Sequence, residues 1–244
     1  MKPITMICVY LLFFSYLMHA QFVTSIIQKE TDSIWYGNGT TRSTKLERLL
    51  AHVSYKLEKA DTLELTYWKA YLYYKTGLSY LTDNKEKAKD HLVQGIAILE
   101  KLENPNSETL TLQGTLHSTM IGVQRNKAWP LSIKAGELFD RALKYAEQNP
   151  RAYLGLGKSD FYRPVEYGGG KMVEVHLKKA ILYYNQEEQS VKKGPSWGKD
   201  EAFYFLSAFY AKNDRMRDAR FYNNLGLKEF PKSELLLRQK EKIN

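Results

Sequence analysis

The chain has 244 residues, of which 43% are apolar and 26% are charged, and its formal net charge is +9. This length and composition are typical of a soluble globular protein with one or two domains and a sizeable core. No run of Lys and Arg is longer than two residues, so the positive charge indicates solvated helix faces that favour anionic partners such as acidic peptides, lipid head groups or cell-wall polymers.

Residues 1–20 have the layout of a secretory signal peptide. Lys2 gives a positive start, an apolar run extends from Met6 to Met18, and cleavage is expected near Ala20. The run is too short for a transmembrane helix, which needs about 20 apolar residues. We therefore expect an exported protein, periplasmic or secreted, with no transmembrane segment in the mature chain and no nucleic acid among its partners.

Cys8 is the only cysteine, and it lies within this apolar run, so the mature chain is expected to have none. It follows Ile7 instead of the small residue that normally precedes a lipoprotein cysteine, which favours a soluble protein over a lipid-anchored one. An exported protein without disulfides depends on core packing for its stability, and this suits the bacterial periplasm. Loss of Lys2 with the signal peptide lowers the expected net charge from +9 to +8.

Residues 21–43 are predicted to form an N-terminal extension with a short helix over 22–33. Thr44 is predicted to begin the first helix of the main domain, residues 44–244, because Glu47 follows three positions later as in a capping box. Ser107 is the predicted cap of a later helix. Helical periodicity, interrupted by turn residues, predicts further helices over residues 62–81, 85–102, 107–123, 131–148 and 233–244.

The segment from Asp200 to Pro231 carries large, aliphatic, small and aromatic residues at fixed helical spacings. The residues of this pattern are Phe203, Leu206, Ser207, Tyr210, Ala219, Gly226 and Pro231. The pattern resembles the tetratricopeptide (TPR) repeat, a helical hairpin of about 34 residues in which small residues let two helices pack closely. The resemblance implies a binding scaffold built of stacked hairpins.

Three earlier segments fit the same hairpin less strictly, over residues 62–102 and 107–148 and from Asn149 onward. Close helix contacts are expected at small residues, namely Gly157, Ala180, Ser207 and Ala219. Almost no segment alternates with period two, so no sheet is expected. The predicted fold is all-α, a TPR-like α–α solenoid of about four antiparallel helix pairs with partial caps.

Two motifs strengthen the resemblance and narrow it to one group. Residues 164–170 read Pro-Val-Glu-Tyr-Gly-Gly-Gly, and residues 195–198 read Pro-Ser-Trp-Gly. Over residues 44–233 the chain resembles a group of exported bacterial TPR proteins that share this turn and the later Pro-x-Trp-Gly, and that have no agreed biochemical role. It is more distantly similar to the periplasmic TPR component associated with tripartite transporters.

The sequence Gly168-Gly169-Gly170-Lys171 invites comparison with a phosphate-binding loop. Such a loop needs a glycine at position 165 and a Ser or Thr at position 172, where this chain has Val165 and Met172. A strand should also precede it, whereas a helix is predicted here. A tight turn between two helices, with glycines at positive φ, is the favoured interpretation.

No catalytic or metal-binding constellation is visible in the sequence. Metal ligands on one helix stand three or four residues apart, and no two histidines of the mature chain are that close. No G-x-S-x-G motif and no nucleophilic cysteine are present after residue 20. We therefore predict no catalytic residues, no metal and no cofactor, and a function other than that of an enzyme.

In TPR stacks the first helices of successive pairs line a concave groove. Alignment to the repeat predicts that the groove is lined by basic and aromatic residues, which are Lys69, Tyr73, Arg151, Lys158, Phe161, Tyr162, Tyr204 and Lys212. Glu201 falls on the same strip. Lys, Arg and Tyr donate charge-assisted hydrogen bonds, so the predicted partner is a protein or peptide, and an acidic one is favoured.

The leading hypothesis is thus an exported, non-enzymatic TPR scaffold that binds a peptide or protein in its concave groove. A small-ligand-binding accessory protein of a periplasmic transport system is the alternative, and a closed apolar cavity would favour it. A hydrolase with carboxylates converging in a cleft is a third possibility that no motif supports.

Overall fold

The computed structural model describes residues 26–37, 41–57, 62–188 and 194–244. The predicted signal peptide, residues 1–20, lies outside the described residues. The described part of the predicted N-terminal extension forms a helix over residues 26–35. No strand occurs among the described residues, and none of their helices is long and apolar enough to cross a bilayer. The chain forms two compact units, Met1–Leu102 (unit 1) and Glu103–Asn244 (unit 2).

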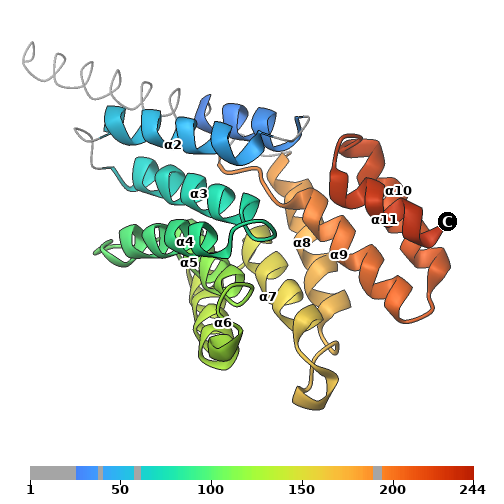
Figure 1. Ribbon diagram of the computed structural model, residues 1–244. Helices are drawn as coiled ribbons and strands as arrows, with labels where there is room; N and C mark the ends of the chain where they lie inside the picture. The colour runs from blue at the N-terminus through green and yellow to red at the C-terminus, as the bar shows by residue number, and fades with distance from the viewer. Residues whose placement is uncertain (1–25, 38–40, 58–61, 189–193) are drawn as a thin grey trace, which may run out of the picture. The chain divides into compact units, whose positions relative to one another are not determined.

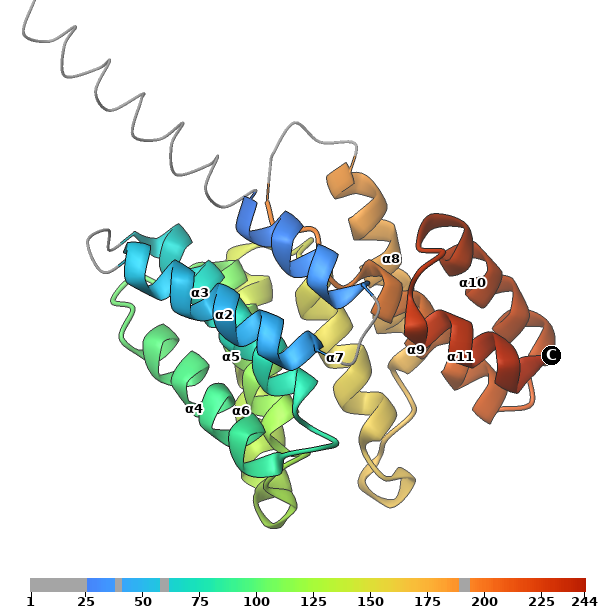
Figure 2. The same cartoon turned by 45° about the horizontal axis from the view of Figure 1, so that its top comes forward.

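The described part of unit 1 contains one helix pair, the helix that precedes it and the helix over residues 26–35. The helices are α2 (Arg42–Leu57), α3 (Leu63–Ser79) and α4 (Lys85–Glu100), and Figure 2 shows α3 and α4 side by side. The predicted start at Thr44 is two residues late, because the carbonyl of Thr41 already accepts a hydrogen bond from the amide of Lys45. Glu47 forms an ion pair with Lys87 of α4, at 3.3 Å, instead of completing a capping box.

The aromatic residues of α3 form the core of unit 1. Tyr67, Trp68, Tyr71 and Tyr74 recur at helical spacing and are each at most 4% exposed. Neighbouring rings in this row lie 5.3–6.1 Å apart, centroid to centroid. Gly77 then lets α4 approach, since a Cβ at this position would stand 2.9 Å from Cγ of Leu92. The small residue Gly77 therefore lets α3 and α4 come close together beyond the row of aromatic rings.

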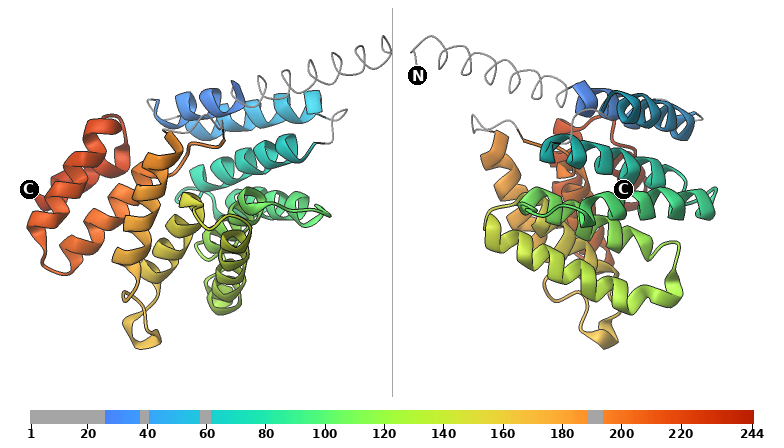
Figure 3. Two further views of the ribbon diagram at one scale, coloured as in Figure 1. Left: turned by 180° about the vertical axis from the view of Figure 1, so that it is seen from behind. Right: turned by 90° about the vertical axis from the view of Figure 1, so that its left-hand side faces the viewer.

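The described residues of unit 2 form three helix pairs and a closing helix, which can be followed in Figures 1 and 3. The helices are α5 (Ser107–Met120), α6 (Ala128–Tyr145), α7 (Pro150–Tyr162), α8 (Val173–Glu188), α9 (Lys199–Lys212), α10 (Met216–Glu229) and α11 (Glu234–Ile243). The pairs are α5 with α6, α7 with α8, and α9 with α10, and the two helices of each pair contact each other. The first helices are also in contact, α5 with α7 and α7 with α9. The second helix of one pair also contacts the first helix of the next. With the pair in unit 1, the predicted four pairs are confirmed.

Small residues sit between the helices of each pair, as predicted. Gly157, Ala180, Ser207 and Ala219 are all buried. The Ser207 hydroxyl donates a 2.8 Å hydrogen bond to the backbone carbonyl of Ala219, which joins α9 to α10. A Cβ on Gly157 would stand 2.6 Å from Cδ2 of Leu177, so α7 and α8 touch at this glycine.

The start of α5 differs from the sequence-based expectation by one residue. Asn106, not Ser107, caps the helix: its side chain accepts from the amide of Thr109, whose hydroxyl lies within hydrogen-bond distance of the Asn106 amide. Ser107 instead donates a 2.9 Å hydrogen bond to the carbonyl of Ala142 in α6. Asn is as good a cap as Ser, so adjacent Asn and Ser leave the choice to tertiary contacts.

The glycine-rich segment is a turn between α7 and α8. A short 3-10 helix, η2 (Val165–Tyr167), is followed by Gly168 with φ +80°, and Gly170 has φ +87°. Both angles lie in the left-handed region that favours glycine. Gly169 has no room for a side chain, because a Cβ there would collide with the carbonyl of Arg163. The predicted role of these glycines as turn residues is confirmed.

Candidate functional site

Helices α7 and α9 are the first helices of successive pairs, and both have well-defined starts. The Asn149 side chain accepts hydrogen bonds from the amides of Arg151 and Ala152, and Pro150 occupies the first helical position of α7. Gly198 precedes α9 with φ +100°. Because α7 and α9 contact each other, side chains along their shared face are brought together from positions more than 40 residues apart.

Most of the sequence-predicted groove residues meet on this shared face. The face, which we call the α7/α9 patch, consists of Lys158, Phe161, Tyr162, Tyr204, Phe205 and Lys212. Phe205 lies at its centre: its ring centroid is 5.4 Å from that of Phe161, 5.7 Å from that of Tyr162 and 4.9 Å from that of Tyr204. All three contacts are edge-to-face, a favourable arrangement for aromatic rings.

Two lysines of the α7/α9 patch stand over its rings. Lys158 Nζ lies 5.2 Å from the centroid of Phe205, and Lys212 Nζ lies 5.8 Å from that of Phe161. Both distances are within the range of a cation–π interaction. Lys158 also forms a short ion pair with Glu201, which the repeat alignment had placed on the same strip. The patch therefore combines apolar rings, two ammonium groups and one carboxylate.

Exposure within the patch is uneven. Tyr162 is 68% exposed and Lys212 is also exposed, while Phe205 is only 5% exposed. Phe205 is thus the buried ring against which the other rings pack, and Tyr162 is the most exposed ring of the patch. Phe205 could not be singled out from the sequence, because it follows Phe203 and Tyr204 in a run of three aromatic residues on α9.

Arg151 has a different role from the other predicted groove residues. It is only 1% exposed, and its guanidinium contacts two carboxylates and a backbone carbonyl. Nε donates to Glu108 at 2.8 Å, the two terminal nitrogens donate to Glu187 at 3.0 and 2.6 Å, and Nη1 donates to the carbonyl of Pro195 at 2.7 Å. Asn149 adds a 2.8 Å hydrogen bond to Glu108. In this structure Arg151 joins α5, α7, α8 and the segment before α9, and does not face solvent.

The electrostatics of this network follow from burial and charge. Burial alone would lower the pKa of Arg151, but the Glu108 carboxylate, followed by Glu187, raises it overall. Burial also raises the pKa of Glu187, and the opposing effect of Arg151 offsets this only in part. An arginine is suited to such a site because its planar fork binds two carboxylates and stays charged.

Lys69 and Tyr73, the remaining predicted groove residues, belong to α3 in unit 1. Both are half-buried. The Tyr73 ring centroid lies 6.1 Å from that of His91, and burial raises the pKa of Tyr73. Because both lie on α3 in unit 1, they are not part of the α7/α9 patch.

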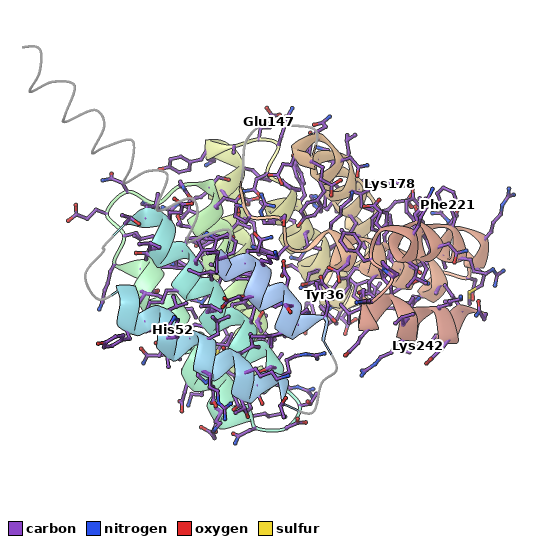
Figure 4. All side chains as sticks on the ribbon, turned by 90° about the horizontal axis from the view of Figure 1, so that it is seen from above. Tyr36, His52, Glu147, Lys178, Phe221 and Lys242 are labelled. Atoms are coloured by element: carbon purple, nitrogen blue, oxygen red, sulfur yellow. The ribbon has the colours of Figure 1, made fainter. Side chains whose placement is uncertain are left out.

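Two recesses lie beside the Arg151 network in unit 2. The smaller has about 20 Å³ of free volume, room for about one water molecule, and is lined by residues that include Thr115, Phe139 and Trp197. The larger is open, has a volume of about 470 Å³ and is lined mainly by polar side chains, among them Tyr183 and Glu187. Glu147, at its rim, is labelled in Figure 4. Among the described residues, no cluster of His, Cys, Asp and Glu is arranged to hold a metal ion.

Comparison with known proteins was made by sequence and by structure, and only solved structures are similar to this chain. No family model matches the chain, and neither does any curated protein. Among solved structures, the HusA haemophore from Porphyromonas gingivalis is 21% identical, with a TM-score of 0.58 over 77% of this chain and 92% of HusA. TTC0263, a thermophilic TPR protein of Thermus thermophilus, is 16% identical, with a TM-score of 0.55 over 81% of this chain and 90% of its own.

A third solved structure is YrrB, described as a TPR protein with an unusual peptide-binding site. It is 19% identical to this chain, with a TM-score of 0.37 over 90% of this chain and 97% of its own. The helix pairs, the small residues between them and the similarity to TTC0263 together confirm the predicted all-α, TPR-like fold.

Proposed function

We propose that this protein is an exported, non-enzymatic helical-repeat scaffold that binds an acidic peptide or protein segment on the α7/α9 patch. The observation that supports this most directly is the convergence of Phe161, Tyr162 and Tyr204 around Phe205, with Lys158 and Lys212 standing over the rings. Clustered aromatic side chains with a few fixed charges are typical of the energetic centres of protein interfaces.

The chemistry of the patch fits a carboxylate-bearing partner with apolar neighbours. Tyr162 offers a large ring, two-thirds exposed, that loses little entropy on binding because it has only two side-chain torsions. Lys212 is exposed and close to that ring system, so it is placed to pair with a partner's carboxylate. Lys158 already pairs with Glu201, so a partner's carboxylate would compete with Glu201 for it.

Reversing the charge of Lys158 and Lys212 together is expected to weaken binding of acidic peptides by at least about 100-fold. The reason is that each charge-assisted hydrogen bond contributes roughly 1.5–3 kcal/mol. The measurement is fluorescence anisotropy with a library of acidic, aromatic-containing peptides. The matched control is Lys240→Glu/Lys242→Glu on α11, which changes the net charge equally at exposed positions away from the patch.

A site-specific crosslink tests the same proposal in cells. A photoreactive phenylalanine analogue at position 162 is expected to capture a partner, and the double charge reversal is expected to abolish this adduct. The same analogue at Phe221, which is 56% exposed on α10, is the control. Equal adducts from both positions, or peptide affinities unaffected by the charge reversal, would refute the proposal.

A small ligand in the larger recess is the second candidate. Its volume of about 470 Å³ lies within the usual range for ligand sites, about 300–1,000 Å³, although most of the residues that line it are of polar types. HusA is described as a haemophore, which makes haemin a reasonable first ligand to test. If haemin binds there with Tyr183 as an iron ligand, titration is expected to shift the Soret band, and Tyr183→Phe is expected to change the shifted spectrum. An unshifted band, or an unchanged spectrum in Tyr183→Phe, counts against this candidate.

A further inference from the structure

A second cluster of exposed apolar side chains lies at one end of unit 2 and shares no residue with the α7/α9 patch. It is formed where α6 begins and where α7 turns into α8, at the lower end of that hairpin in Figure 1. Its members, which we call the tip, are Trp129, Ile133, Val165, Tyr167 and Met172, and they are 67%, 44%, 72%, 66% and 45% exposed, respectively. The ring centroids of Trp129 and Tyr167 are 6.4 Å apart, so the two segments meet.

The tip is also strongly basic. Segments 125–134 and 163–172 contain Arg125, Lys127, Lys134, Arg163 and Lys171, all exposed, and Glu166 is their only acidic residue. Their net charge is therefore +4, out of +9 for the whole chain. Arg163 has a weak contact with Asp160, at 3.6 Å, and is still 44% exposed. Positive charge is concentrated here around exposed aromatic and aliphatic side chains.

The structure explains why these side chains are held outward. Trp129 and Ile133 are one turn apart on α6, while the buried Leu138, Phe139 and Ala142 of the same helix face the core. Val165 and Tyr167 belong to η2, and the left-handed glycines that follow return the chain to α8. The two recesses described above are lined by other residues, and the tip side chains are exposed to solvent.

We infer that the tip docks on an anionic lipid surface, which is a function separate from the proposed peptide binding. Trp and Tyr favour the head-group level of a bilayer because one end of each ring is apolar and the other polar. Lys and Arg around them pair with lipid phosphates, and aliphatic side chains such as Val165 and Ile133 reach the acyl boundary. A projecting surface that is both basic and apolar fits a flat anionic interface.

The test uses the full chain and vesicles of phosphatidylglycerol mixed with phosphatidylcholine. Trp129 is a local reporter, because it is 67% exposed whereas Trp68 and Trp197 are 4% and 7% exposed and Trp35 is half-buried. We expect a blue shift of tryptophan emission on vesicle addition and quenching by brominated acyl chains. Trp129→Phe is expected to remove most of both signals while the chain still sediments with the vesicles.

Two further variants separate the apolar and the charged contributions. Trp129→Ala/Tyr167→Ala is expected to lower the vesicle partition coefficient, measured by co-sedimentation, at least tenfold. Phe221→Ala, which removes an exposed ring elsewhere, is the control (Figure 4). Lys127→Gln/Lys134→Gln is expected to lower the partition coefficient roughly 25-fold, about fivefold for each basic residue. Lys240→Gln/Lys242→Gln is the control for this variant. Any binding of the apolar segment within residues 1–20 is common to all of these chains.

Three outcomes would overturn the inference. The first is vesicle binding with no change in Trp129 emission, which would place the contact elsewhere on the chain. The second is equal binding to vesicles of phosphatidylcholine alone, which would remove the role of charge. The third is an equal loss in the tip variants and their controls. Failure here leaves the peptide-binding measurements untouched, because no residue of the α7/α9 patch is altered.

Discussion

Replacing Arg151 with alanine is expected to lower the free energy of unfolding of unit 2 by about 3 kcal/mol. Removing one partner of a buried ion pair costs roughly 3–5 kcal/mol, because the remaining charges are left without compensation. The lower end applies here, since the side chains of Glu108 and Glu187 are still 23% and 40% exposed and regain some hydration. The carbonyl of Pro195 would also lose its donor.

The measurement must report on unit 2 alone, because two compact units need not unfold together. Hydrogen exchange of peptides from α5, α7 and α8 across a guanidinium series gives the local stability. Arg151→Lys is expected to lie between the parent and Arg151→Ala, because it keeps the charge but loses the fork. Arg238→Ala, at a side chain that is 74% exposed, is the control and should change stability by less than about 0.5 kcal/mol. An equally small change in Arg151→Ala would show that the network contributes little.

Replacing Gly155 with alanine is expected to destabilise unit 2 by roughly 1–3 kcal/mol, through overpacking. A Cβ on Gly155 would come closer than 3 Å to three ring atoms of Phe139. The ring cannot move away easily, because its other side faces Gly114, where a Cβ would stand 2.7 Å from Cε1. Phe139 is fully buried, so one ring of α6 fits between a glycine of α5 and a glycine of α7.

Gly136 in α6 provides a matched control for this substitution. A Cβ there meets nothing within 4 Å, so Gly136→Ala is expected to stabilise the protein by up to about 1 kcal/mol through helix propensity. Guanidinium unfolding followed by circular dichroism compares the two variants. Adding Phe139→Leu to Gly155→Ala is expected to restore part of the loss. Stabilisation by Gly155→Ala itself would mean that α5, α6 and α7 pack less closely than described.

Local pattern predicted the helices and their pairing well. Glycine, alanine and serine at repeat spacing marked the contacts at Gly157, Ala180, Ser207 and Ala219, because only small residues let two helices meet so closely. The glycine turn after α7 was predictable for a similar reason, since positive φ favours glycine. Helix starts were less certain, as Thr44 and Ser107 show, because several neighbouring polar residues cap equally well.

The candidate site was predictable only in part. Repeat positions brought Lys158, Phe161, Tyr162, Tyr204 and Lys212 to one face, as their contacts around Phe205 show. The role of Arg151 was not predictable, because its partners Glu108 and Glu187 lie 43 and 36 residues away. A repeat alignment predicts which face of a helix a residue occupies. It does not predict whether an acidic residue of another helix will form an ion pair with it and bury it.

The Arg151 network has a consequence for how the repeats behave as a set. In stacked repeats each hairpin interacts with its immediate neighbours, and stability is approximately a sum of terms for the hairpins and for the interfaces between them. Here one side chain of α7 bonds to α5, to α8 and to the segment before α9 at once. The interfaces on both sides of the α7/α8 hairpin therefore share one guanidinium, and we expect truncation after α8, which removes the Pro195 carbonyl, to weaken the contact with α5 as well as the new end.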